Sequence, residues 1–203
     1  TAGGTREPID PVRFIGNRSS GKQGIAIANA AKNRGAEVQL IAANCDVASL
    51  TGIDVIHVET TLEMQSALQA HFDSCDILIM SAAVADARPM RISEQKIKKA
   101  TLNSIELQQN PDLLAELSPR KGKRVMVGFA AETKEHLQEA RRKLESKGLD
   151  VIYVNDVSGG AIFGQDTTMG TILLRNEADI AIKEVSKDAL SNVLLDHAIR
   201  QLG

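Results

Sequence analysis

The chain contains few aromatic residues and little excess charge. Aromatic side chains make up 2% of its 203 residues, and tryptophan is absent. Proteins that bind single-stranded nucleic acids stack the bases on aromatic side chains, so this composition argues against that function. The formal net charge is −2, which argues against a basic nucleic-acid surface and against a polybasic membrane anchor.

Cysteines and long apolar runs are also scarce. The only two cysteines, Cys45 and Cys75, do not have the spacing of a metal site. Two lone cysteines favour a reducing compartment over a disulfide scaffold. No apolar run reaches the roughly 18 residues that a membrane span requires. We therefore expect a soluble, cytoplasmic protein with neither a nucleic-acid nor a membrane partner.

The hydrophobic pattern indicates one α/β domain over residues 1–203. Helical and strand periodicities alternate, which is typical of a Rossmann-like, mainly parallel sheet flanked by helices. The pattern predicts helices over 20–34, from 61 onward, up to 147 and over 186–202, and strands over 38–43, 55–58, 76–80, 125–127 and 151–154. Two later strands, over 171–174 and 180–185, predict an antiparallel addition at the C-terminal end of the sheet.

Two local signals predict helix starts. Thr60 and Glu63 have the spacing of a capping box, and the helix that follows should turn Leu62, Met64, Ala67 and Leu68 toward the core. Further along, Asn110-Pro111-Asp112 predicts a short helix. There Asn110 would be the N-cap and Pro111 would occupy the first helical position.

Polar motifs follow several of the predicted strands, at 3–7, 81–86, 129–133 and 155–158. In open α/β sheets, ligands bind beyond the carboxyl ends of the strands, near the reversal of strand order. The sequence therefore predicts a binding site where these four segments meet.

The most informative stretch is Arg-Phe-Ile-Gly-Asn-Arg-Ser-Ser-Gly-Lys-Gln-Gly at 13–24. It places a polar, basic loop before a helix, and the backbone N–H groups of a helix start form a ready anion site. By spacing alone, Asn17 is a typical turn residue, and the basic run at 96–99 is typical of a solvated face. Lys143 and Lys147 share a helix face; such lysines are usually on the surface, although together they could reach a triphosphate.

Taken together, these segments resemble the phosphopantothenoylcysteine synthetase family. The resemblance covers about residues 1–175 and rests on the loop at 13–24, Ser-Ala-Ala-Val-Ala-Asp at 81–86, Lys-Ile-Lys-Lys at 96–99, Pro-Asp-Leu-Leu at 111–114 and Gly-Phe-Ala-Ala-Glu-Thr at 128–133. It implies a ligase that joins 4′-phosphopantothenate to L-cysteine through an acyl-cytidylate. CTP would be the co-substrate, Mg²⁺ the metal and a homodimer the assembly.

The resemblance also implies site residues. Asn17 and Lys96 would be catalytic, Asn17 by holding the acyl group and Lys96 by neutralising charge on the nucleotide phosphate. Arg13, Asn17 and Ala83 would bind the substrate. The nucleotide would be bound by Met80, Ser81, Ala82, Asp86, Lys96, Pro111, Asp112, Leu113, Leu114, Phe129, Lys143 and Lys147. No metal ligand is predicted.

The first residues, Thr-Ala-Gly-Gly, read as the end of a strand whose earlier part is missing. We therefore expect the domain to be cut from a longer chain. In the family it resembles, a flavin-dependent decarboxylase domain precedes it in many bacteria, and FMN would belong to that domain alone. The antiparallel region at 167–185 is a candidate dimer interface.

Two other functions are compatible with this architecture. An NAD(P)-dependent oxidoreductase of the short-chain type shares the early glycine turn, but the chain has no G-x-G-x-x-G motif, and its sole tyrosine, Tyr153, is followed four residues later by Val157 rather than a lysine. A non-catalytic nucleotide-binding module would leave Asn17 and Lys96 without a role. The sequence does not decide whether the nucleotide co-substrate is CTP or ATP.

Overall fold

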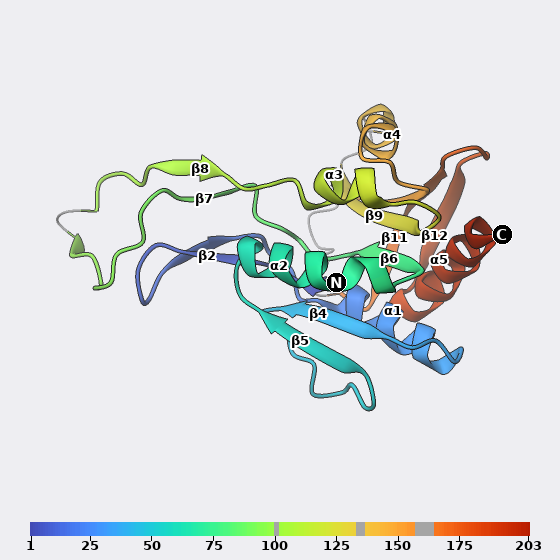
Figure 1. Ribbon diagram of the computed structural model, residues 1–203, viewed down its shortest axis with the longest axis horizontal. Helices are drawn as coiled ribbons and strands as arrows, with labels where there is room; N and C mark the ends of the chain where they lie inside the picture. The colour runs from blue at the N-terminus through green and yellow to red at the C-terminus, as the bar shows by residue number, and fades with distance from the viewer. Residues whose placement is uncertain (100–101, 133–136, 157–164) are drawn as a thin grey trace.

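The computed structural model describes residues 1–99, 102–132, 137–156 and 165–203 (Figure 1). Residues 133, 157 and 158 of the polar motifs therefore lie outside the described part. The strands are β1 (Ala2–Gly3), β2 (Arg6–Pro8), β3 (Phe14–Gly16), β4 (Gln39–Ala43), β5 (Asp54–Val58), β6 (Ile77–Met80), β7 (Ala87–Pro89), β8 (Leu107–Gln109), β9 (Val125–Glu132), β10 (Val151–Asp156), β11 (Thr167–Leu174) and β12 (Ile180–Ser186). The helices are α1 (Lys22–Asn33), α2 (Thr61–His71), α3 (Leu113–Leu117), α4 (Leu137–Ser146) and α5 (Lys187–Leu202), with 3₁₀ turns at Phe72–Ser74 and Ser118–Arg120. No helix in these ranges is both long and apolar enough to cross a membrane.

The central sheet has the strand order of a Rossmann fold. A three-stranded sheet, β5-β4-β1, meets a five-stranded one, β6-β9-β10-β11-β12. They are joined by a parallel bridge between Gly4 and Ala83, where the Ala83 N–H donates to the Gly3 carbonyl at 2.9 Å. Counted along the parallel strands, the order is 3-2-1-4-5-6, and it reverses between β1 and β6. β11 and β12 add antiparallel strands at one edge, which confirms the predicted C-terminal addition.

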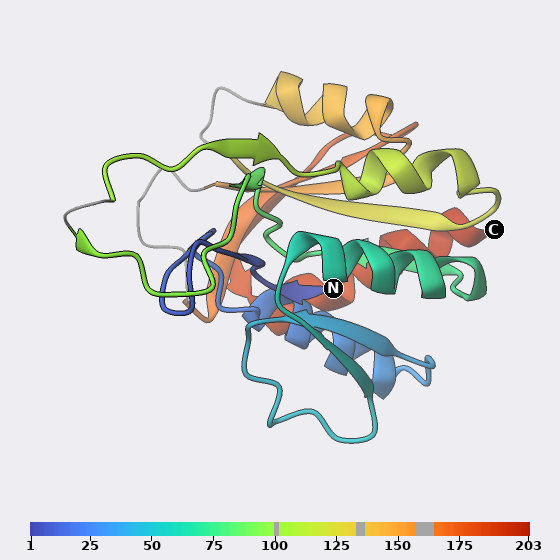
Figure 2. The ribbon, with the colours of Figure 1, turned by 60° about the vertical axis from the view of Figure 1, so that its left-hand side comes forward.

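Helices cover both faces of the sheet, because alternate strand residues point to opposite sides (Figure 2). On one face, α2, α3 and α4 pack on side chains such as Met80 and Met126. On the other, α1 and α5 pack on side chains such as Val125 and Val127. The successive residues Val125, Met126 and Val127 thus contribute alternately to two separate hydrophobic cores. Because both faces of the strand are buried, its sequence is a continuous apolar run.

Glycines set the position of α1 against β1. Gly21, with φ +75°, precedes the helix, and Gly35, with φ +85°, follows it. Both conformations favour glycine, so they fix where the helix begins and ends. Gly24 faces β1 so closely that an added Cβ atom would lie 2.6 Å from the Ala2 Cβ. The last glycine of a Rossmann fingerprint allows this same close helix–strand packing.

Two local predictions were wrong in detail. The capping box at Thr60 and Glu63 is present, but Leu62 is exposed, whereas Met64 and Leu68 are buried as expected. The N-cap of α3 is not Asn110 but Asp112, whose Oδ1 accepts from the Ala115 N–H at 3.1 Å.

The side chain of Asn110 does not cap α3 because it forms hydrogen bonds with other segments of the chain. Its Nδ2 donates to Thr61 Oγ1 at 3.1 Å and to the Ala85 carbonyl at 2.8 Å, while its Oδ1 accepts from Arg88 Nη1 at 2.7 Å. These bonds tie the start of α2 to the segment that follows β6. They orient the side chain of Asn110 toward these partners rather than toward α3, and Pro111 lies before the first helical residue.

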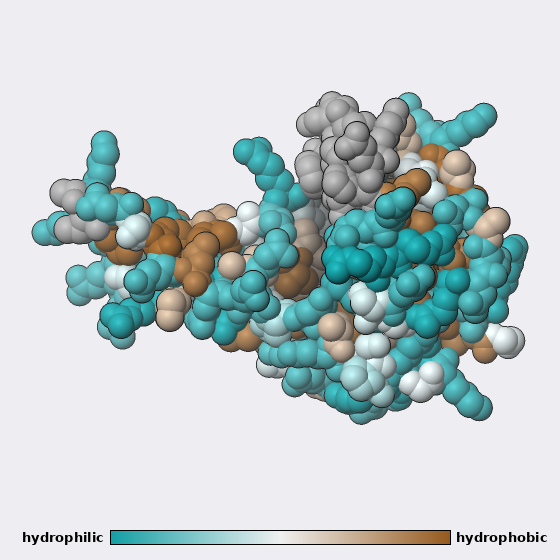
Figure 3. Space-filling model, turned by 90° about the horizontal axis from the view of Figure 1, so that it is seen from above, coloured by the Kyte–Doolittle hydropathy of each residue, from teal (hydrophilic) through white to brown (hydrophobic). Residues whose placement is uncertain are grey.

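Two hairpins that the periodicity did not predict extend from the sheet. β2 pairs with β3, and β7 pairs with β8 at the base of a long arm, described over residues 87–99 and 102–109, which projects away from the helical layers (Figure 1). Apolar side chains gather along the arm on the surface (Figure 3). The exposed large apolar residues of the two hairpins are Val12, Phe14, Met90, Ile92, Ile105 and Leu107. We call these six residues the apolar patch.

Candidate active site

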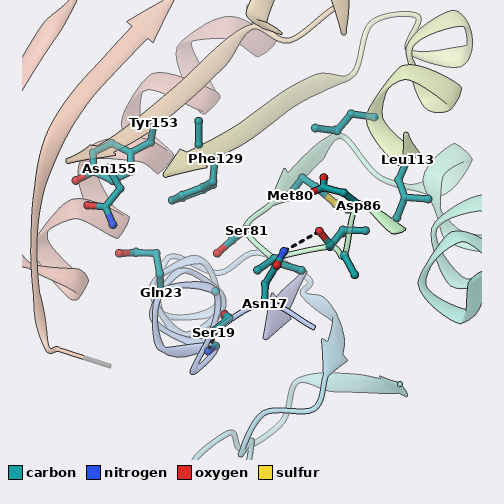
Figure 4. A pocket seen from close by; sticks show the side chains of 18 of the residues that line it. Asn17, Ser19, Gln23, Met80, Ser81, Asp86, Leu113, Phe129, Tyr153 and Asn155 are labelled. Carbon is teal, nitrogen blue, oxygen red and sulfur yellow. Dashed lines mark hydrogen bonds between the residues drawn. The ribbon is translucent and has the colours of Figure 1, made fainter. Parts of the chain in front are cut away.

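A cleft of about 670 Å³ opens at the carboxyl ends of the parallel strands, where the strand order reverses (Figure 4). Ligands bind at this position in folds of this class. Its walls come from segments far apart in the chain: 17–24, 80–86, 109–114, 129–130 and the side chains of Lys143, Lys147, Tyr153, Asn155, Thr168 and Lys187. Of the four polar motifs after the strands, three contribute to these walls, through residues 81–86, 129–130 and Asn155, whereas no residue of 3–7 lines the cleft.

The start of α1 forms the floor of the cleft. The Gly21 N–H donates to Ser19 Oγ at 3.4 Å, and the N-cap residue Gly21 has no side chain that could cap the first turn of the helix. Uncapped N–H groups at a helix start carry partial positive charge and attract anions. Lys22 and Gln23 line the same wall.

Asn17 stands at the mouth of this loop. Its Nδ2 donates to the Val84 carbonyl at 3.0 Å, a bond drawn in Figure 4. An amide nitrogen has two hydrogens, so this bond fixes the plane of the amide and leaves the second N–H to a ligand. Asn17 is exposed, and it therefore meets the geometric requirement of a donor to a bound carbonyl.

The segment after β6 forms one wall and carries the predicted residues Met80, Ser81, Ala82, Ala83 and Asp86, all of which line the cleft. Hydroxyls hold its backbone in place. Thr1 Oγ1 accepts from the Ala82 N–H at 3.0 Å, and Thr5 Oγ1 accepts from the Ala85 N–H at 2.9 Å. The small side chains leave room for a ligand to approach this rigid backbone, and the exposed Asp86 places a carboxylate at its end.

Two lysines contribute positive charge to the lining of the cleft. Lys143 and Lys147 both line the cleft, as do the predicted residues Pro111, Asp112, Leu113 and Leu114. Lys147 Nζ lies 2.9 Å from Asp112 Oδ2. Because Asp112 also caps α3, one carboxylate positions both the helix start and the lysine. A bound polyphosphate would compete with Asp112 for Lys147.

An aromatic pair closes the far end. Phe129 lines the cleft as predicted, and its ring meets that of Tyr153 edge to face, with centroids 5.7 Å apart. The buried Tyr153 hydroxyl lies 2.9 Å from Thr168 Oγ1, and Thr168 Oγ1 donates to Asn155 Oδ1 at 3.0 Å. Since the threonine has one proton, Tyr153 is the donor to it. Sequence reasoning assigned no role to Asn155 and missed Gln23, Thr168 and Lys187; polar residues at strand ends were the only available signal.

Arg13 and Lys96 lie outside the cleft walls of the described chain. Arg13 sits after the turn of the β2–β3 hairpin, where its guanidinium forms an ion pair with Asp10. That hydrogen-bonded guanidinium is the main reason why the pKa of the Asp10 carboxyl lies well below its ordinary value. Lys96 is exposed on the arm. The arm leaves the cleft wall after Asp86 and returns to it at Asn110.

The cleft carboxylates suit a metal that is held mainly by its ligand. Within the described ranges, no three His, Cys, Asp or Glu side chains gather as a metal site. Mg²⁺ is commonly bound through one or two carboxylates together with substrate phosphates. Asp86 is the exposed carboxylate of the cleft that is not engaged as a cap or in a described ion pair, and it fits that role.

Comparison with known proteins identifies the family. The family model of the DNA/pantothenate metabolism flavoprotein C-terminal domain matches residues 1–202. The chain belongs to this family. The match includes the C-terminal residues beyond 175, for which the sequence motifs had shown no specific resemblance.

Relatives in this flavoprotein C-terminal family are named for coenzyme A biosynthesis. The chain is 43% identical over 209 residues to the "coenzyme A biosynthesis bifunctional protein CoaBC" of Mycobacterium tuberculosis strain H37Rv, covering 97% of this chain and 50% of the relative. It is 42% identical to the protein of the same name from Vibrio cholerae, covering 99% of this chain and 51% of that protein. The chain therefore spans about half the length of these curated relatives.

Solved structures share the fold. The C-terminal domain of a CoaBC protein superposes with a TM-score of 0.84 at 33% identity, covering 99% of this chain and 92% of that one. A complex of the Cab2 mutant H337A with phosphopantothenate-cysteine has a TM-score of 0.77 at 14% identity, covering 98% and 84% of the two chains, and shows the common fold alone. The Rossmann-like α/β architecture is thus that of the CoaBC C-terminal domain.

Proposed function

We propose that this domain joins 4′-phosphopantothenate to L-cysteine in coenzyme A biosynthesis, with CTP as co-substrate. The observation that carries the proposal is the cleft itself, whose lining includes an amide donor, Asn17, and two lysines, Lys143 and Lys147. The names of the relatives support the pathway.

The chemistry needs both kinds of group. A carboxylate is a poor acyl donor because its leaving group would be oxide. Attack of the phosphopantothenate carboxylate on the CTP α-phosphate expels pyrophosphate and forms an acyl-cytidylate. The amine of cysteine then attacks the acyl carbon, loses a proton and releases CMP. The first step needs cations at the phosphates, and the second needs a donor at the acyl oxygen.

The residues divide between these steps. Lys143, Lys147 and the start of α1 would hold the phosphates, and Asp86 is the residue that would hold Mg²⁺ together with them. Mg²⁺ supplies charge neutralisation and orientation of the phosphates. Asn17 donates its second N–H to the acyl oxygen. Lys96 acts on the phosphate from the arm, so the position of the arm determines whether it reaches the cleft.

The domain works as a homodimer in this proposal. Monomeric soluble proteins seldom expose contiguous large apolar surfaces, and the apolar patch of the two hairpins fits a second copy of the chain, which would also fix the position of the arm. In the described β11–β12 region, by contrast, Met169 is the exposed large apolar residue. Sedimentation should give a dimer, and replacing Phe14 and Ile92 by serine should give monomers. A monomeric unmodified chain, or a variant that stays dimeric, would contradict this interface.

We also propose that the whole protein contains a second domain besides this one. The relatives are bifunctional and about twice as long as the matched segment, so we place the flavin-dependent decarboxylase, with its FMN, in the remaining half and the full protein in the cytoplasm.

The experiment is an activity assay on the purified domain with CTP, Mg²⁺, phosphopantothenate and cysteine. Pyrophosphate release that requires the acid, together with CMP release that requires both the acid and the amine, supports the proposal. ATP in place of CTP sets the nucleotide preference. Oxidation of NADPH without nucleotide cleavage would support the oxidoreductase instead.

A further inference from the structure

Asp10 is a buried carboxylate with more partners than its turn requires. It lies in the turn of the β2–β3 hairpin, and its side chain is 0% exposed. Oδ1 accepts from the backbone N–H groups of Val12 and Arg13, both at 2.9 Å. These two bonds form a side-chain-stabilised turn of a kind common for aspartate. Oδ1 thus serves the turn itself.

The second oxygen serves a different element. Oδ2 accepts from Arg13 Nε at 2.9 Å, from Arg13 Nη2, and from the backbone N–H of Ile97 at 3.1 Å. Arg13 Nη2 also donates to the Ile97 carbonyl at 2.8 Å. Both backbone groups of Ile97 are thus held by the Asp10–Arg13 pair, although 87 residues separate Asp10 from Ile97.

We call the hydrogen bonds between the Asp10–Arg13 pair and Ile97 the tie. A second contact between the arm and the hairpin turn lies on the other side of Lys96. The Ser93 N–H donates to the Ile9 carbonyl at 3.0 Å, so the arm contacts the hairpin turn on both sides of Lys96. Lys96 is exposed, and it immediately precedes the clamped Ile97. Its backbone position is consequently set by the turn that carries Asp10.

We propose that Asp10 is a positioning residue that couples Arg13, a substrate-binding residue by the family resemblance, to the segment of Lys96, so that these two cationic residues move as one unit. The inference rests on the proposed function. Asp10 itself does not touch the substrates. It acts by orienting Arg13 through one carboxylate edge and by holding the arm through Ile97.

The test is Asp10→Asn together with Asp10→Ser. Asparagine keeps one oxygen for the turn but places an NH₂ group against the Arg13 and Ile97 donors. Serine can stabilise the turn through its hydroxyl, yet it has no second oxygen for the tie. The matched control is Asp46→Asn. Asp46 Oδ1 accepts from the Ala48 N–H at 2.9 Å in a comparable exposed turn away from the arm.

Two readouts separate positioning from simple folding. Trypsin cleavage after Lys96 under native conditions, mapped by mass spectrometry, reports the tie. Pyrophosphate release without cysteine reports the activation step. We expect both Asp10 variants to be cleaved at least about tenfold faster and to release pyrophosphate at least about tenfold more slowly, since misplacement of about 1 Å can cost 10²-fold. The KM of the two Asp10 variants for CTP should stay close to that of the unmodified chain. The Asp46→Asn variant should match the unmodified chain in both readouts.

Other results would overturn the inference. Unchanged cleavage in both variants means that Asp10 does not hold the arm. Faster cleavage with normal pyrophosphate release means that the tie is structural only. If the unmodified protein releases no pyrophosphate, the proposed function fails and the positioning role fails with it, even where proteolysis reveals the tie.

Discussion

Replacing Asn17 by aspartate tests the proposed acyl site with a nearly isosteric change. The side chain keeps its shape, so the loop should fold. In the structure, Nδ2 donates to the Val84 carbonyl at 3.0 Å; in the variant a carboxylate oxygen would face that carbonyl and the acyl oxygen of the intermediate. Loss of one donor to a developing oxyanion typically slows a reaction by about 10²–10³, or about 2.7–4 kcal/mol.

The cost to folding should be smaller than the cost to catalysis. The bond to Val84 is exposed, and an ordinary hydrogen bond contributes about 0.5–1.5 kcal/mol. Activation of the carboxylate depends chiefly on the lysines and the metal. We therefore expect near-normal formation of the acyl-cytidylate, slow discharge by cysteine, and accumulation of the bound intermediate.

The assay is quenched flow with mass spectrometry, following pyrophosphate, acyl-cytidylate and CMP separately. The control is Asn192→Asp, because Asn192 Nδ2 also donates to a backbone carbonyl at 3.0 Å but lies on α5, outside the cleft walls. Equal slowing of both half-reactions by Asn17→Asp, or no slowing of either, would refute the acyl-site role and return Asn17 to being a turn residue.

Three further changes examine the cleft and its support. Lys96→Gln should block pyrophosphate release while the free energy of unfolding changes by no more than about 0.5 kcal/mol, as is usual for surface substitutions; normal release would remove Lys96 from the mechanism. Lys147→Gln should raise the KM for CTP about tenfold, since charged hydrogen bonds are worth about 1.5–3 kcal/mol, and an unchanged KM measured by initial rates would show that this lysine does not meet the phosphates. Gly24→Ala should destabilise the fold by about 1–3 kcal/mol in urea titration, because overpacking against β1 outweighs better helix propensity; a more stable variant would mean that the helix can shift freely.

The regular part of the fold was predictable because its signals are local. The apolar run at 125–127 and the glycine after α1 are visible in the sequence, and both the strand and the helix end are confirmed. The arm was not predictable in this way. Its residues are mostly exposed and lack their own core, so they leave no hydrophobic period, and their positions depend on distant partners such as Asp10.

The candidate site, like the fold, was predictable from the sequence only in part. Strand ends indicated where the cleft lies, and the family resemblance supplied Asn17 and the lysines. The Tyr153–Thr168–Asn155 chain depends on the pairing of β10 with β11, in which Asn155 lies opposite Gly170. An added Cβ at Gly170 would lie 2.9 Å from the Tyr153 hydroxyl. Such a register depends on pairing between two strands and leaves no local pattern in the sequence, so this part of the cleft became visible only in the structure.

The most direct test of the proposed reaction is a single-turnover experiment without cysteine. The domain is mixed with CTP, Mg²⁺ and phosphopantothenate, and the products are followed by mass spectrometry. The account predicts pyrophosphate in an amount equal to that of active sites, together with an enzyme-bound acyl-cytidylate that yields CMP only after cysteine is added. Absence of pyrophosphate until cysteine arrives, or formation of CDP and phosphate instead, would contradict it.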